Sequence, residues 1–168
     1  MPALIPALNR LAAAVGAGGR RVDRSYRVFC SPRLVRFTEM EYAVPRAHAV
    51  EAARAVKEIA ERAAYAVSFP IEVRFVAADD ALLSPAVGRD TCYIAVHVYR
   101  GRPWEPYFRE VERLMDGFGG RPHWGKRHFQ TAETLRPRYP EWDRFAAVRK
   151  RLDPEGRFTN DYVRRVLG

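Results

Sequence analysis

The chain has 168 residues, 48% of them hydrophobic and 29% charged, which suffices for one domain with a hydrophobic core and argues against wholesale disorder. The formal net charge of +9 comes almost entirely from arginine, and the longest basic run spans only residues 149–151. We therefore interpret the charge as a compositional bias and expect no nucleic acid partner, with a basic nucleic-acid-binding domain as the less favoured alternative.

Cysteine use and the N-terminal residues bear on where the protein works. Cys30 and Cys92 are the only cysteines and form no CxxC spacing, so we expect no zinc site. Both lie in apolar, strand-like surroundings, which predicts buried thiols in a reducing cytoplasm. Residues 1–19 lack a basic start, which argues against a signal peptide, and no segment reaches the roughly 18 apolar residues of a membrane span. A cytoplasmic protein is expected, and peripheral association with a membrane stays open.

The first part of the chain mixes helical and extended patterns. Leucines and a valine at helical spacing predict a short helix over residues 4–15, and residues 22–30 look extended. Residues 34–44 predict a strand with Glu39 and Glu41 on one face. Residues 48–65 predict an amphipathic helix, whose apolar stripe comprises Val50, Ala53, Val56, Ala60 and Ala63.

Two further strands show clear alternation. In residues 71–76, the apolar residues Ile71, Val73 and Phe75 alternate with Glu72 and Arg74. In residues 91–100, one face carries Ile94, Val96 and Val98, and the opposite face carries Tyr93, Ala95, His97 and Tyr99. The connections between strands are short, which favours antiparallel pairing.

The second half of the chain reads as helices around one loop. A helix is predicted from residue 103, with a buried stripe of Trp104, Tyr107, Phe108, Val111, Leu114 and Met115. A loop follows over residues 120–128, and another helix is expected to begin at Pro140. We predict an α+β fold in which one antiparallel sheet has its helices packed on one face, with residues 1–168 as a single domain.

Candidate site residues fall on one sheet face and in the loop. If strands 71–76 and 91–100 share a sheet with their apolar faces against the helices, then Glu72, Arg74 and His97 meet on the opposite face. Arginine suits oxygen-rich or anionic groups, and histidine can act as a base near neutral pH. The alternative is that Glu72 and Arg74 are an ordinary pair on a solvated surface.

The loop 120–128 offers four further candidates. We interpret Trp124 as a core residue and His128 as structural, and the spacing of His123 and His128 argues against a metal pair. Lys126 is of more interest because it is a lysine in a chain that uses arginine almost everywhere else. The sequence has no glycine-rich phosphate-binding loop, so we expect it to hold no dinucleotide by itself.

Five motifs in order carry a family resemblance: FTEMEYAVP at 37–45, EVR at 72–74, YIAVH at 93–97, PHWGK at 122–126 and DPEGRFTNDY at 153–162. The chain resembles the C-terminal portion of the sugar-1,4-lactone oxidases, with alditol oxidases as close relatives. The resemblance implies a partial substrate-binding cap domain of a vanillyl-alcohol-oxidase-type flavoenzyme. The N-terminal FAD-binding domain of that family is not in this chain, so FAD would be held mainly by a flavin-binding domain in cis or in trans.

The resemblance also implies a reaction and roles for residues. A sugar lactone or polyol would be oxidised at a CH–OH group, with oxygen or another acceptor reoxidising the flavin. Glu72 and Arg74 would bind the substrate, with Arg74 also near the flavin. His97 would be the base or its positioner, Lys126 would add positive charge beside the reduced flavin, and His123 would line the flavin edge. The alternative is a truncated, non-catalytic remnant or an interaction module.

Overall fold

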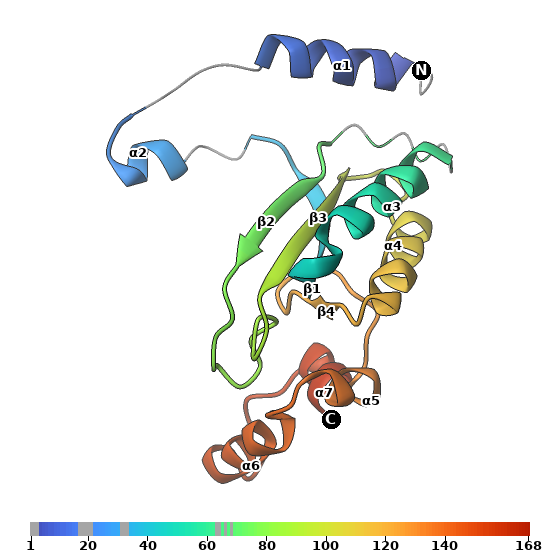
Figure 1. Ribbon diagram of the computed structural model, residues 1–168. Helices are drawn as coiled ribbons and strands as arrows, with labels where there is room; N and C mark the ends of the chain where they lie inside the picture. Colours follow the sequence, from blue (N-terminus) through green and yellow to red (C-terminus); the bar gives the residue numbers. More distant parts are fainter. Residues whose placement is uncertain (1–3, 17–21, 31–33, 63–64, 66, 68) are drawn as a thin grey trace.

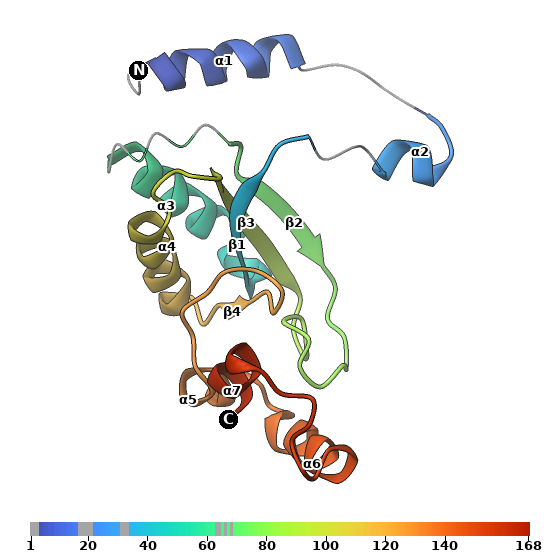
Figure 2. The same ribbon diagram turned by 180° about the vertical axis from the view of Figure 1, so that it is seen from behind.

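The computed structural model describes residues 4–16, 22–30, 34–62, 65, 67 and 69–168. A four-stranded antiparallel sheet in the order β2-β3-β1-β4 lies at its centre. The strands are β1 (Phe37–Pro45), β2 (Glu72–Val76), β3 (Thr91–Tyr99) and β4 (Arg121–Pro122). The helices α3 (Ala49–Arg62) and α4 (Glu105–Gly117) cover one face, and Figures 1 and 2 show this arrangement from opposite sides. The predicted α+β sheet with helices on one face is confirmed.

The main core lies between this sheet and the two helices. β1 contributes Met40, Tyr42 and Val44, and β3 contributes Ile94 and Val96. The helix α4 adds the predicted stripe, of which Tyr107, Phe108, Val111 and Met115 are buried. Side chains alternate along a strand, so a shift of one residue in the pairing of β1 with β3 would turn their apolar side chains away from the helices. Each of these side chains contributes about 1.5–3 kcal/mol when buried. The core therefore fixes which strand face remains for polar residues.

The predicted apolar stripe of α3 is confirmed for Val56, which is buried, and wrong for Val50. Ala49, Ala52, Val56 and Ile59 are buried in the core, whereas Val50 is 64% exposed. Ala53 and Ala60 are partly buried, and Ala63 lies outside the described residues. Contacts with α4 and β1 set the rotation of the helix, and small alanines allow close approach. The size of an apolar residue therefore does not decide whether it is buried here.

The prediction that the apolar face of β2 meets the helices is also wrong. β2 stands at the end of the strand order, and Val73 and Phe75 are 43% and 57% exposed. Both lie on the same sheet side as the helices, because they pair with the core residues Ile94 and Cys92. The helices pack against β1 at the middle of the sheet, so the apolar face of β2 extends beyond them.

The N-terminal elements lie apart from the sheet in both views (Figures 1 and 2). The helix α1 (Ile5–Gly16) forms as predicted, but Leu4, Leu8, Leu11 and Val15 are 52% to 80% exposed. The expected extended segment contains instead the short helix α2 (Ser25–Phe29), which needs only local hydrogen bonds to the Arg24 carbonyl, whereas a strand needs a neighbour. Cys30 is exposed, against prediction, and Cys92 is buried as predicted.

The short helix η2 (Arg46–His48) leads directly into α3. A second, smaller core lies at the C-terminal end, where the elements are α5 (Ala132–Leu135), η3 (Arg136–Arg138), α6 (Trp142–Leu152) and α7 (Asp161–Leu167). The helix expected from Pro140 thus begins at Trp142, and α5 and η3 were not predicted. The second core consists of Val87, Leu135, Tyr139, Trp142 and Val166. Within the described part of the chain, no helix is both long enough and apolar enough to cross a bilayer.

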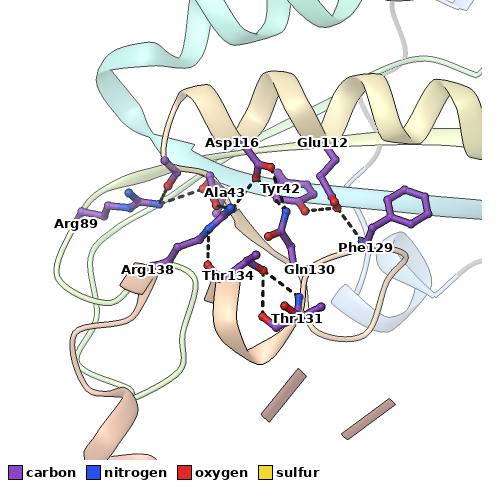
Figure 3. A network of polar contacts seen from close by, with 12 residues as sticks. Tyr42, Ala43, Arg89, Glu112, Asp116, Phe129, Gln130, Thr131, Thr134 and Arg138 are labelled. Atoms are coloured by element: carbon purple, nitrogen blue, oxygen red, sulfur yellow. Dashed lines mark hydrogen bonds and ion pairs between the residues drawn. The ribbon is translucent and has the colours of Figure 1, made fainter. Parts of the chain in front are cut away.

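A polar network joins the C-terminal elements to the sheet (Figure 3). Arg138 donates to the Asp116 carboxylate at 2.7 Å, to the Gly120 carbonyl at 2.8 Å and to the Thr134 carbonyl at 3.0 Å. Gln130 donates to the same Asp116 carboxylate at 3.0 Å. Arg138 therefore ties α4, the start of the loop and α5 together.

A second part of the network holds the end of the loop against β1. The Tyr42 hydroxyl donates to Glu112 at 2.5 Å, and the Phe129 backbone N–H donates to the same carboxylate oxygen at 2.8 Å. Burial raises the pKa of the Glu112 carboxyl, although these two donors oppose the shift. Both ends of the loop are thus fastened to α4.

We expect Arg138→Met to lower the free energy of unfolding by about 1–3 kcal/mol, because one carboxylate and two backbone carbonyl groups lose a charged donor whose own side chain is largely buried. The matched control is Arg136→Met, in which an exposed ion pair with Asp143 is lost, at a cost of about 0–1 kcal/mol. Urea unfolding of the purified chain measures both values. Equal losses in the two variants would contradict a clamping role for Arg138.

Candidate functional site

Ionisable side chains gather on the sheet face opposite α3 and α4. Met40 and Tyr42 point into the core, so Glu39 and Glu41 point to the other face of β1. Glu39 pairs with His97 in β3, while Glu41 pairs with Ala95, which in turn pairs with Glu72 in β2. The register therefore places carboxylates from two strands and an imidazole from the third side by side.

Glu41 is the centre of the group. Glu41 is only 1% exposed to solvent. Its two carboxylate oxygens have different cationic partners. Arg74 donates to Oε1 and Lys126 donates to Oε2. Arg74 comes from β2 and Lys126 from the loop after β4, so one buried carboxylate joins two distant parts of the chain.

Glu39 and Glu72 extend the network on either side. Glu39 Oε1 accepts from Lys126 Nζ at 2.5 Å and lies 3.1 Å from His97 Nε2. Because a carboxylate only accepts, the proton of neutral His97 belongs on Nε2, and Nδ1 is buried with no partner among the described residues. Glu72 Oε1 lies 3.6 Å from Arg74 Nε.

The charge state of Glu41 follows from its partners. Burial by itself would raise the pKa of this carboxyl, but the hydrogen bonds and charges of Lys126 and Arg74 hold the pKa below its ordinary value. Glu41 is therefore an anion at neutral pH, and the two cations stay in place around it.

The loop reaches Glu41 because it continues the ladder that β4 begins. The His123 N–H donates to the Glu41 carbonyl and the Arg127 N–H to the Glu39 carbonyl, each at 2.9 Å, and a turn from His123 to Lys126 closes at 3.1 Å. The predicted loop is thus correct apart from β4. His123 lies opposite Glu41 in the ladder and so shares its face, and its Nδ1 accepts from the Gly125 N–H at 3.0 Å.

The helix α7 braces this loop from outside the sheet. The Tyr162 hydroxyl donates to the Trp124 carbonyl at 2.5 Å and accepts from His128 Nε2 at 2.9 Å. Burial and the charge of Arg165 lower the pKa of His128 to about 4, so the ring is neutral near pH 7. Trp124 packs on the second core, and its Nε1 donates to the Leu83 carbonyl at 2.7 Å. The structural role predicted for His128 is confirmed, whereas Trp124 is partly buried and also lines the open groove described below.

An open groove of about 660 Å³ lies beside the network. Glu39 and Lys126 form part of its wall, together with Phe37 at the start of β1. The C-terminal residues Asn160 and Tyr162 form another part. A ligand in this groove would contact the charged network from the open side of the sheet.

The structure brings together the residues that the sequence singled out. Glu72, Arg74, His97 and Lys126 all belong to the network, and His123 lies on the same face by register. Sequence reasoning placed Glu39 and Glu41 on one face but gave them no role. The available signal was a pair of acidic residues at alternate positions in an otherwise apolar strand, because buried carboxylates need cationic partners.

Three side chains of the network lie close enough together to bind a metal ion. Glu39, Glu72 and His97 each offer a ligand atom, and these atoms lie within 4.8 Å of one another. Lys126 is already bound to Glu39, and Arg74 lies beside Glu72. The described side chains thus supply their own cations to these carboxylates, and the chemistry of this group is that of hydrogen-bond donors and acceptors.

Comparison with known proteins finds similarity to enzymes named for sugar lactones and alditols. The family model described as D-arabinono-1,4-lactone oxidase matches residues 1–166. An L-gulono-1,4-lactone dehydrogenase of Mycobacterium tuberculosis is 59% identical over 99% of this chain and 39% of its own length. The L-gulonolactone oxidase of Bos taurus is 35% identical over 99% of this chain and 40% of its own. A Streptomyces alditol oxidase is 42% identical over 77% of this chain and 31% of its own. The chain thus spans about two fifths of the first two relatives.

We expect Glu41→Gln to lower the free energy of unfolding by about 1–3 kcal/mol at neutral pH, because two cations lose their anionic acceptor. The folded-state pKa of Glu41 is below the ordinary 4.5, so its stabilising contribution is complete above pH 4.5 and is lost as the pH falls through the folded value. The difference between wild type and variant should therefore shrink in acid. Chemical unfolding across this pH range measures it, with the exposed Glu58→Gln as control. A difference that stays constant well below pH 4.5 would contradict this assignment.

Proposed function

Because the chain belongs to the D-arabinono-1,4-lactone oxidase family, we propose that it is the substrate-binding portion of an FAD-dependent oxidoreductase that oxidises a CH–OH group of a sugar-1,4-lactone or polyol. The observation that carries this proposal is the network itself. Glu72, Arg74, His97 and Lys126 come from three separate elements and meet on one open sheet face. A polyhydroxylated substrate is the ligand that such a face suits.

The alternation of donors and acceptors supports a sugar-like ligand. Each hydroxyl group both donates and accepts a hydrogen bond, so it is best satisfied between a carboxylate and a cationic N–H group. Glu72 and Arg74 offer such a pair on β2, and both are about half exposed. Glu39 and Lys126 offer a second pair in the wall of the groove. We assign substrate binding to Glu72 and Arg74, and orientation of the reacting hydroxyl to Lys126.

We assign the role of accepting the proton of the reacting substrate hydroxyl group to the hydrogen-bonded pair of Glu39 and His97. Glu39 faces the groove, and His97 lies behind it with Nε2 3.1 Å from the carboxylate. The two groups share one hydrogen bond, so they act as a unit in accepting a proton. In this arrangement His97 orients the carboxylate and stabilises its charge.

FAD, when bound, supplies the hydride acceptor, with oxygen or another acceptor reoxidising it. The donor set of this chain fits one edge of a flavin ring: Arg74 is half exposed, and Lys126 and His123 lie on the same open face. It does not fit the rest of the cofactor, because the sequence contains no glycine-rich phosphate-binding loop. A flavin-binding domain, in cis or in trans, would hold most of FAD and complete the site.

Exposed apolar side chains support packing of this chain against further protein. The apolar stripe of α1 and the residues Val73 and Phe75 of β2 are exposed within the described structure. Large exposed apolar side chains gathered on one element are typical of surfaces that pack against further protein. The truncated remnant or interaction module remains the second candidate, and activity in the presence of a flavin-binding domain separates the two.

We expect the purified chain to be colourless and to lack oxidase or dehydrogenase activity, because it lacks a phosphate-binding loop for FAD. Visible absorbance after incubation with FAD and desalting measures this. A yellow preparation that retains stoichiometric FAD would contradict the division of roles between this chain and a flavin-binding domain.

With a flavin-binding domain supplied, we expect Arg74→Lys to lower turnover by about tenfold or more, because lysine keeps the charge beside Glu41 but loses the planar fork. The midpoint of unfolding should change little. The matched control is Arg54→Lys on the exposed face of α3, which should leave both values unchanged. Equal turnover in wild type and Arg74→Lys would remove Arg74 from the site.

A further inference from the structure

The carboxylates of the network slightly outnumber its cations. Glu39, Glu41 and Glu72 carry three negative charges, while Arg74 and Lys126 carry two positive charges. These five side chains together have a formal charge of −1. Both cations already point N–H groups at carboxylates, so neither is a free anion-binding group.

Two further arginines lie near this face, and the contacts of both guanidinium groups are made away from Glu41. The buried Arg121 donates to the carbonyl oxygens of Arg138, Pro85 and Val87, and is directed toward the C-terminal elements. Arg127 follows Lys126 in the loop and lines the groove, but its guanidinium lies over the Trp104 ring, 5.3 Å from the ring centre. Neither offers its charge beside Glu41.

Neutral and anionic ligands would meet this network differently. A hydroxyl group can donate to a free lone pair of a glutamate and accept from Lys126 or Arg74 without breaking an existing bond. A carboxylate would have to replace Glu39 or Glu41 on a cation, or lie beside them as a like charge. Glu41 is 1% exposed, and a buried carboxylate that loses its cation is strongly destabilising.

We propose that Glu39 and Glu41 make this site selective for neutral polyhydroxylated ligands and against the aldonate anion that forms when a sugar lactone hydrolyses. The inference rests on the proposed function and names the specificity of the same site. A lactone and its aldonate carry the same pattern of hydroxyl groups along the carbon chain. The negative charge of the opened form is the property that a site with its cations already paired can reject.

The test is a titration of the full 168-residue chain with L-gulono-1,4-lactone and, separately, with sodium L-gulonate, followed by backbone amide chemical shifts in NMR spectra. Ionic strength is kept equal, and a mildly acidic buffer limits hydrolysis of the lactone. We expect the wild-type chain to bind the lactone at least about tenfold more tightly than the aldonate.

Glu41→Gln removes one negative charge from beside both cations. We expect it to reduce the preference for the lactone by about tenfold, through tighter binding of the aldonate. Glu39→Gln, at a partly exposed position, tests the same idea if Glu41→Gln folds poorly. Glu58→Gln on the exposed face of α3 removes the same charge far from the network and should keep the wild-type preference.

The outcomes separate the two levels of the proposal. Equal affinity of the wild-type chain for lactone and aldonate would overturn the selectivity and leave the proposed function standing. An unchanged preference in folded Glu41→Gln and Glu39→Gln would overturn the role of these glutamates. Binding of neither ligand to the wild-type chain would count against the proposed site itself, and the selectivity would fall with it.

Discussion

The structure depends on one buried carboxylate with two cations. Glu41 lies in the middle of the sheet, and Arg74 and Lys126 bind its two oxygens from opposite sides. Taking a carboxylate out of water costs several kcal/mol, so it is tolerated only where its partners are held in place. The loop after β4 and the edge strand β2 must therefore keep their positions relative to β1, and the need to neutralise Glu41 links three elements into one site.

The C-terminal part of the chain provides the support for this arrangement. Lys126 stands in a loop that pairs with β1 through its backbone, while Tyr162 holds the carbonyl of Trp124 and Arg138 holds that of Gly120. These bonds connect residues that are far apart in sequence, so the position of one lysine depends on helices that contribute little to the main core. The second core thus helps to hold the loop against the sheet.

The sequence predicts much of this arrangement. The predictions that were wrong concern features that depend on contacts between distant segments. The alternation of side chains in β3 predicts that His97 and Ile94 lie on opposite faces of the sheet, because successive side chains of a strand point to opposite faces. The same rule could not show that Val73 is exposed, because coverage depends on where helices from other segments pack. Val50 was assigned to the apolar stripe by helical spacing, whereas in the structure Ala49 and Ala52 are the buried residues at this end of α3. Glu41 acquires its partners only through tertiary contacts, so its role was not visible in β1 alone.

The openness of the site follows from the same construction. Strand alternation puts the apolar core on one side of the sheet and forces the charged network onto the other, where Arg74 stays half exposed. A chemical site that excludes water needs a second wall, and among the described helices only α7 reaches the groove, since α3 and α4 are committed to the core. The relatives are about two and a half times as long as this chain, so they carry enough additional protein to provide that wall. In such an assembly, this chain would contribute recognition of the hydroxyl groups, and the opposite wall would contribute the redox chemistry.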